Sequence, residues 1–206
     1  MLLAIDTSAG TSVAVVDPDG GVLAERSVAD TMRHAEVVGR LIEESLAEAN
    51  TSPPALSGVV AGMGPGPFTG LRVGIASART FAFAIGKPLV PIVSHDAVAF
   101  ARYRDGYSGA MLVVTDARRR ELYWSAYSGA DEYGLPVRFD GPGLGKPEAL
   151  PHARLTRFDA HTVSAGALGL VAELSLANGR SFVADEPLYL RSPDVTLPSG
   201  PKRVTA

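Results

Sequence analysis

The chain has 206 residues, of which 46% are hydrophobic, and it carries a formal net charge of −3 with no cysteine. A chain of this length is expected to form one compact unit with two subdomains and to bury enough apolar surface to fold without disulfides. The missing cysteines exclude disulfides, thiolate metal sites and thiol nucleophiles, and the mild acidity argues against a protein that holds nucleic acid by its own field.

The first half alternates apolar strands with amphipathic helices. Ser-Ala-Gly joins the first two apolar runs, which predicts a β-hairpin. Thr31 is expected to cap the first helix and Ser94 the third. In chain order the pattern predicts strands at 2–8, 11–17 and 21–28, a helix at 33–50, a strand at 56–64, a helix at 70–85, a strand at 87–94 and a helix at 94–104.

The pattern restarts after Gly109. An apolar strand at 110–116 ends in Asp116, as the first strand contains Asp6, so the two halves open in the same way. We therefore expect an α/β fold of two duplicated lobes, residues 1–105 and residues 106–206, the second with a loose tail. The second half predicts strands at 121–128 and 136–139, an unassigned stretch at 141–159, a helix at 163–177 and a packed closing segment at 187–191.

Two acids are candidates for a phosphate or metal site. Asp6, Thr7 and Ser8 place a carboxylate and two hydroxyls at the end of a buried strand, and Asp116 is the matching acid of the second half. Such groups can hold Mg²⁺ through water and receive phosphate. The alternative is a turn that satisfies its own backbone.

The glycine-rich stretch GPGPFTGLR, residues 64–72, lacks the lysine of a P-loop, and its two prolines remove amides that would hold an anion. Glycine in a helix interior costs about 1 kcal/mol relative to alanine, so the glycines that follow need a packing reason. Close contact is that reason, either with the chain's own sheet or, as we expect, with another subunit. The smooth stripe consists of Gly70, Gly74, Ala78 and Ala82.

The residues described so far resemble the TsaB (YeaZ) family. The match rests on LAIDTSAGTSVAVV (3–16), RHAEVVGRLIEESL (33–46), the continuous stretch 58–94, DARRRELYWSAY (116–127) and PLYLR (187–191). The element Gly-Pro-Gly-x-Phe-Thr-Gly-Leu-Arg within 64–72 is the most specific part. Family members usually have a further strand and turn between about 141 and 162, where the second lobe is short here. Either the chain has lost that element or part of the sequence is missing at this point.

The resemblance implies an actin-like ATPase (ASKHA, ribonuclease H-like) fold and a non-catalytic role. The family assists a TsaD-like catalytic subunit and a TsaE-like ATPase in making threonylcarbamoyladenosine (t6A) at adenosine 37 of tRNAs. The catalytic subunit carries a His-x-x-x-His metal pair on the helix corresponding to 33–50, and here the pair reads His34 and Val38. The implied chain therefore has no catalytic residue, no metal and no cofactor of its own, and ATP or ADP and Mg²⁺ belong to the complex.

The resemblance also implies a partner interface on the first lobe. We expect a homodimer when the chain is alone, contact with tRNA only through the complex, no membrane contact and a cytoplasmic location. On this expectation Gly74→Arg abolishes assembly and leaves the fold intact. The interface residues carried over are His34, Val38, Leu41, Gly70, Arg72, Gly74 and Ala78.

Two other functions stay open from the residues. An ATP-dependent phosphotransferase of the actin-like superfamily would use Asp6 and Asp116 around a metal-bound nucleotide, and SAGALG at 164–169 is a weak candidate for its adenosine contact. An M22-type glycoprotease is disfavoured by the broken metal pair and by the absence of cysteine.

Overall fold

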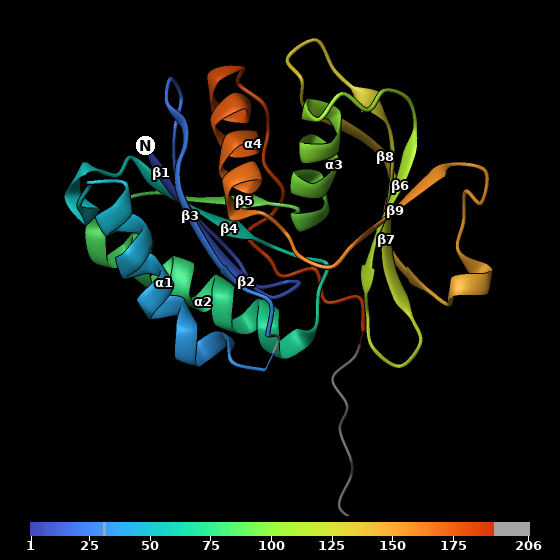
Figure 1. Ribbon diagram of the computed structural model, residues 1–206, viewed down its shortest axis with the longest axis horizontal. Helices are drawn as coiled ribbons and strands as arrows, with labels where there is room; N and C mark the ends of the chain where they lie inside the picture. Colours follow the sequence, from blue (N-terminus) through green and yellow to red (C-terminus); the bar gives the residue numbers. More distant parts are fainter. Residues whose placement is uncertain (31, 192–206) are drawn as a thin grey trace, which may run out of the picture.

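The computed structural model describes residues 1–30 and 32–191. The predicted helix cap Thr31 and the predicted loose tail lie outside the described residues. Two sheets stand side by side, and their helices are stacked between and beside them (Figure 1). The elements of the first half are β1 (Leu2–Asp6), β2 (Thr11–Asp17), β3 (Gly21–Val28), α1 (His34–Glu48), β4 (Gly58–Gly62), α2 (Phe68–Ile85), β5 (Leu89–Ile92) and α3 (Ser94–Arg104).

The second half repeats the same start with a smaller sheet. Its elements are β6 (Met111–Asp116), β7 (Leu122–Ala130), β8 (Pro136–Gly145), β9 (Thr156–Ala160) and α4 (Ala165–Ala177). The first sheet has the order β3-β2-β1-β4-β5 and the second has the order β8-β7-β6-β9. In both, an antiparallel three-strand meander receives a parallel strand beside its first strand. The two lobes are therefore architectural duplicates, as the sequence predicts.

The stretch 141–162 contains a strand after all. β8 continues through Gly145 and β9 pairs in parallel with β6, from Met111 opposite Thr156 to Thr115 opposite Ala160. The sequence left 141–159 unassigned, and β9 occupies the end of this stretch. β9 could not be predicted from the sequence, because its residues, TRFDA, contain no run of apolar side chains. The second lobe is nevertheless the smaller one, since within the described residues its sheet has four strands and the first has five.

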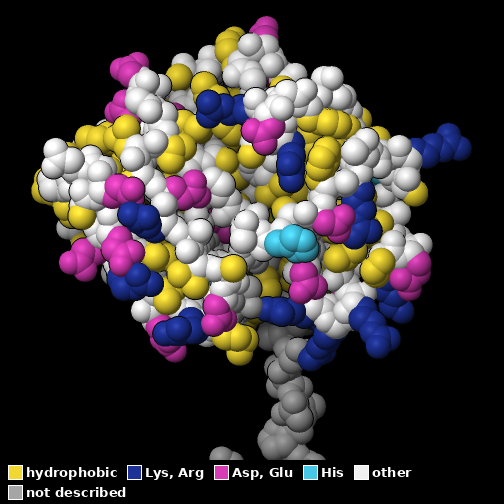
Figure 2. Space-filling view, viewed as in Figure 1, with side chains coloured by type: hydrophobic (Ala, Val, Ile, Leu, Met, Phe, Trp, Pro, Cys, Tyr) yellow, Lys and Arg dark blue, Asp and Glu magenta, His cyan; other side chains and the backbone are white. Residues whose placement is uncertain are grey.

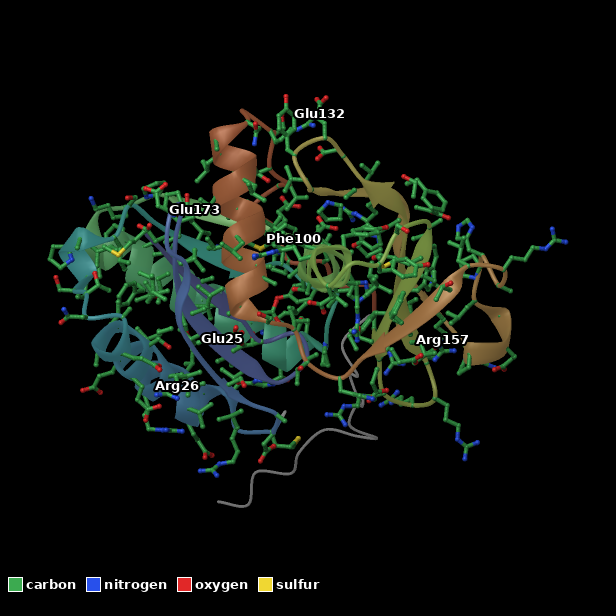
Figure 3. All side chains as sticks on the ribbon, turned by 45° about the horizontal axis from the view of Figure 1, so that its top comes forward. Glu25, Arg26, Phe100, Glu132, Arg157 and Glu173 are labelled. Carbon is green, nitrogen blue, oxygen red and sulfur yellow. The ribbon has the colours of Figure 1, made fainter. Side chains whose placement is uncertain are left out.

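The helices next to the lobe boundary pack across it. α1 and α2 cover one face of the first sheet, whereas α4, from the second half, covers the other face. α3, from the first half, packs on β6, β7 and β8 as well as on α4. Phe100 of α3 lies between these two helices (Figure 3). The order of layers is thus α1 and α2, first sheet, α4, α3, second sheet.

Hydrogen bonds fix the start of α4 on the first sheet. The Ser164 hydroxyl accepts from the Ala167 amide (3.0 Å) and donates to Glu25 (3.0 Å). Glu25, seen near the foot of α4 in Figure 3, also accepts from the Ser12 hydroxyl (2.9 Å). The Ser12 oxygen in turn accepts from the Ala165 amide (3.1 Å). The helix is therefore held by polar contacts at its first turn and by apolar packing along its length.

Two apolar cores sit on the two faces of the first sheet. One lies between this sheet and α1 and α2, and includes Leu3, Ile5, Leu41 and Leu71. The other lies between the sheet, α4, α3 and the second sheet. Both faces of β1 and β4 are covered, which explains why these strands read as continuous apolar runs instead of alternating ones. Within residues 1–30 and 32–191, no helix is long and apolar enough to cross a membrane.

Candidate functional site

The carboxylate of Asp6 is sealed inside the protein at the end of β1. It is 1% exposed and accepts hydrogen bonds from the Ser8 amide (2.8 Å), the Ser8 hydroxyl (2.6 Å) and the Ser94 hydroxyl (2.5 Å). Burial raises the pKa of Asp6, and the hydrogen bonds from Ser8 and Ser94 oppose this shift. The prediction that Ser94 caps α3 is wrong, because α3 begins at Ser94 and the capping position is Val93. The Ser94 hydroxyl donates to Asp6 instead.

The glycine-rich loop lies directly on this turn. A side chain at Gly62 would place its Cβ 1.9 Å from Asp6 Oδ2, and one at Gly66 would lie 2.8 Å from the Cα of Ser8. The Gly64 amide donates to Ser94 Oγ (3.0 Å), and the Ser94 amide donates to the Gly64 carbonyl (2.8 Å). The loop glycines therefore let the chain approach its own strand end. The carboxylate is already surrounded by the chain's own donors.

Asp116 does not share the environment of Asp6. Its side chain is exposed, and it accepts a hydrogen bond from the Arg118 amide (2.9 Å) at the start of a turn. The two acids thus hold equivalent places in the duplicated sheets but not equivalent surroundings. Within the described residues, no three His, Cys, Asp or Glu side chains form a group that could hold a metal ion.

The small-residue stripe of α2 faces inward, which corrects the expectation that it contacts another subunit. Gly70, Gly74 and Ala78 are buried. A Cβ at Gly74 would lie 2.1 Å from Thr7 Oγ1, and one at Gly70 would lie 2.6 Å from the Thr7 carbonyl oxygen. The Thr7 hydroxyl also donates to the Gly70 carbonyl (2.7 Å). The smooth stripe exists to let α2 approach the end of β1, which was the alternative left open by the sequence.

The residues expected on α1 are also in the core. His34, Val38 and Leu41 are buried, and the His34 Nδ1 shares a hydrogen bond with the Thr11 hydroxyl (2.8 Å). Among the residues carried over as an interface, Arg72 is exposed, with its guanidinium 4.8 Å from the ring centre of Phe68. Thr7, His34, Gly70 and Gly74 therefore form one internal cluster.

The outer side of the same two helices presents a different set. We call it the α1–α2 outer surface and define it as Met32, Ala35, Gly39, Val73, Ser77 and Thr80, which are exposed or partly exposed. Met32, Ala35 and Val73 share a hollow of about 270 Å³ at the start of the two helices. The Ser77 hydroxyl donates to the Val73 carbonyl within its own helix (2.8 Å). The six residues that define this surface are all uncharged.

Sequence reasoning missed a polar network inside the second lobe. His95 of α3 is fully buried, with Nδ1 2.8 Å from the Ser125 hydroxyl and Nε2 2.9 Å from the Thr115 hydroxyl. Burial lowers the pKa of His95 to about 3, and the Arg138 charge acts in the same direction. The ring is therefore neutral and ties α3 to β6 and β7. A single histidine in SHDAVAF carries no signal for this role.

A cavity between the lobes was missed as well. It is lined by the loop before α2, the turn between β6 and β7, and the last described residues of the chain. These segments lie far apart in the sequence, so no local motif marks the cavity.

Comparison with known proteins finds relatives along most of the chain. The family model described as TsaD, tRNA N6-adenosine threonylcarbamoyltransferase, matches residues 6–135. An uncharacterized protein of Mycobacterium tuberculosis is 40% identical over 202 residues, covering 94% of this chain and 92% of that protein. The tRNA threonylcarbamoyladenosine biosynthesis protein TsaB of Escherichia coli is 28% identical over 198 residues, covering 96% of this chain and 81% of that protein.

Solved structures agree on the fold. A crystal structure of a Pseudomonas aeruginosa protein with similarity to peptidase YeaZ superposes with a TM-score of 0.78 at 26% identity. The match covers 92% of this chain and 99% of that chain. A second structure, YeaZ from Pseudomonas aeruginosa, gives a TM-score of 0.77 at 24% identity with the same coverage.

Proposed function

Since the chain belongs to the TsaB (YeaZ) family, we propose that it takes part in threonylcarbamoyladenosine synthesis on tRNA as a non-catalytic partner of a TsaD-like subunit. A named relative from Bacillus subtilis, 30% identical over 126 residues, carries the same TsaB description as the Escherichia coli protein. A TsaE-like ATPase, tRNA and any ATP or Mg²⁺ would join at the level of the complex.

Gly39 is the observation that carries the proposed interface. It lies in the middle of α1, where glycine is less favourable than alanine by about 1 kcal/mol. No atom of the described chain lies within 4 Å of the Cβ that another residue would place there, beyond its own helix backbone. The fold itself thus supplies no steric reason for this glycine, in contrast to Gly70 and Gly74. Close approach of a helix from another subunit supplies one.

The surroundings of Gly39 support such a contact. The residues that define the α1–α2 outer surface are uncharged, and Met32 among them is 85% exposed. An exposed flexible apolar side chain is common at surfaces that bind partners. We therefore propose that the interface lies on the α1–α2 outer surface and not on the buried stripe of α2. A second copy of this chain could use the same surface when the partner is absent.

The internal chemistry supports a non-catalytic role. Val38 presents a buried hydrocarbon side chain where the catalytic relatives are expected to have a metal-binding histidine. His34 shares its Nδ1 with Thr11. The carboxylate of Asp6 already accepts three hydrogen bonds from the chain, which disfavours the phosphotransferase alternative.

The test is co-purification with the TsaD-like subunit of the same organism. Gly39→Arg should abolish the complex while the isolated variant keeps the thermal unfolding profile of the wild type, because the position opens onto empty space. Leu176→Arg is the matched control, since it adds the same charge to an exposed position of α4 on the other face of the first sheet. Normal assembly of Gly39→Arg would refute the interface, and unchanged threonylcarbamoyladenosine levels in cells depleted of the protein would refute the function.

Gly74→Arg is unsuitable for this purpose. A Cβ at this position meets Thr7 at 2.1 Å, so the variant is expected to unfold and to lose assembly for that reason alone. The sequence-based expectation that this substitution leaves the fold intact is corrected by the inward orientation of the stripe.

A further inference from the structure

A second cavity is formed by β5, the start of α3, the turn between β7 and β8, the first residues of β8, α4 and the chain that follows α4. We call it the β5–β8 cavity. It measures about 340 Å³, within the range of about 300–1,000 Å³ that is common for ligand clefts. Its walls are mostly apolar and include Ile92, Leu135, Val171 and Phe182. A few polar groups among apolar walls are the usual composition of a small-molecule site.

An ion pair between α3 and β8 lines this cavity and is only partly used by the fold. The side chain of Asp96 is 19% exposed and that of Arg138 is 22% exposed, and Arg138 Nε lies 3.4 Å from Asp96 Oδ1. The Tyr127 hydroxyl donates to the same oxygen (2.7 Å), and Arg138 Nη1 donates to the Gly141 carbonyl (3.4 Å). Within residues 1–30 and 32–191, neither Asp96 Oδ2 nor Arg138 Nη2 takes part in a hydrogen bond. The pair therefore offers one charged acceptor and one charged donor beside the cavity.

The location of this ion pair distinguishes it from the other ion pairs of the chain. Figure 2 shows acidic side chains beside Lys and Arg side chains over much of one face of the molecule. The carboxylate of Asp96 is instead mostly enclosed, and burial raises its pKa, whereas Arg138 and the hydrogen bond from Tyr127 oppose this shift. Tyr127 is itself fully buried, which fixes the direction of the carboxylate. A cationic donor at Asp96 Oδ2 would offset the cost of keeping this group charged.

The other two charged residues of the cavity satisfy each other. Asp131 Oδ1 accepts from the amides of Tyr133 and Leu135 (2.9 Å each), and Asp131 Oδ2 accepts from Arg180 (2.6 Å). The charges of the described lining residues, two acids and two arginines, sum to zero. A ligand without net charge is therefore favoured over a phosphate or a polyamine.

We propose that the β5–β8 cavity binds a small α-amino acid. Its ammonium group donates to Asp96 Oδ2, its carboxylate accepts from Arg138 Nη2, and its side chain contacts the apolar walls. Because Asp96 and Arg138 lie in contact with each other, the ligand has to carry its opposite charges close together, as an α-amino acid does. The inference goes beyond the proposed function, which requires only the α1–α2 outer surface.

The test is calorimetric titration of the full chain with L-alanine and with L-leucine. We expect at least one of them to bind with a Kd of about 1 mM or tighter. Two analogues of leucine each lack one charged group: 4-methylpentanoate has no ammonium, and 3-methylbutylamine has no carboxylate. Both should bind about tenfold more weakly than leucine or worse, because each gives up a charged hydrogen bond. Equal binding of the neutral 4-methylpentanamide would contradict the assignment to an amino acid.

Asp96→Asn keeps an acceptor for the Tyr127 hydroxyl and removes the charge, so it should weaken amino-acid binding by about tenfold or more. Arg138→Gln is a second variant with the same expected loss. Asp105→Asn is the matched control, because it removes the same charge from an exposed position at the end of α3 that does not line the cavity, and it should change affinity less than about twofold.

Failure of the wild type to bind either amino acid would overturn the inference, as would an equal loss of affinity in Asp105→Asn. Co-purification of Asp96→Asn with the TsaD-like subunit is recorded in parallel, because Asp96 is not part of the α1–α2 outer surface. Intact assembly without amino-acid binding by the wild type refutes the ligand site and leaves the proposed function standing.

Discussion

At the scale of single residues, His95 shows how a buried polar group makes stability depend on pH. Its two ring nitrogens meet the hydroxyls of Ser125 and Thr115, and the ring is neutral because its pKa is lowered to about 3. In the unfolded chain the same imidazole has a pKa of about 6.5. Between these values the unfolded state binds a proton that the folded state does not. The contribution of His95 to stability is therefore complete above about pH 6.5 and falls as the pH falls toward 3.

We predict that the free energy of unfolding decreases between about pH 6.5 and pH 5 with a slope of up to about 1.4 kcal/mol per pH unit from this residue. His95→Gln should be less stable at neutral pH but should lose this slope, as measured by urea denaturation across the range. His161→Gln, at an exposed position, is the control and should keep the wild-type slope. An identical slope in wild type and His95→Gln would contradict the assignment.

At the scale of elements, α2 shows which structural features a periodic sequence pattern can predict. The four-residue spacing of small residues correctly predicts a helix with one smooth face. That face packs against Thr7, which lies 63 residues before Gly70 in the chain. Periodicity carries no information on that neighbour. The same limit explains why the outer surface around Gly39 was not singled out, since its importance appears only when the space in front of it is known.

The contrast between these glycines gives a measurable difference in stability. Gly74→Ala should lower the free energy of unfolding by about 1–3 kcal/mol, because its Cβ overpacks the contact with Thr7. Gly39→Ala should raise it by about 0.5–1 kcal/mol, since the helix gains propensity and the space is open. Both values come from chemical denaturation of the isolated chain. Placing Gly74→Ala in a Thr7→Ala background should reduce its cost, and a full cost there would argue against this contact.

Strand and helix positions followed from sequence to a large extent. Strands β1, β2 and β4 are apolar runs bounded by turn residues, and α1 and α2 have clear helical spacing. The local sequence is therefore enough to predict these elements. β9 was missed because TRFDA reads as polar and gains its place from pairing with β6. The turn at Asp6 was identified as a site or a self-satisfied turn. Only the hydroxyl of Ser94, from α3, decides between these two readings.

At the scale of the whole molecule, the two halves of the chain exchange helices. α4 belongs to the second half and covers the first sheet, and α3 belongs to the first half and packs on the second sheet. The proposed division between residues 105 and 106 separates the two similar sheets. It cuts the contacts that bury Ala4, Ala14 and Val16 against Leu168 and Val171.

We therefore predict that residues 1–105 alone do not fold cooperatively, because one face of the first sheet loses its cover. Circular dichroism during urea denaturation should show a broad, non-cooperative transition for this fragment. Co-expression with residues 106–206 should restore a sharp transition, as α4 and α3 regain their sheets. A cooperative transition of the isolated fragment would show that the lobes are independent folding units.

The path of the last described residues has a practical consequence for handling the protein. The Leu188 amide donates to the Met63 carbonyl (2.8 Å) and Tyr189 packs on Phe68, and both Tyr189 and Arg191 line the cavity between the lobes. Met1 lies at the opposite end of β1, where its carbonyl accepts from the Ser57 amide (2.9 Å). The five residues of β1 separate the two points by about 17 Å. A dye, affinity tag or surface anchor placed before Met1 therefore leaves the cavity accessible.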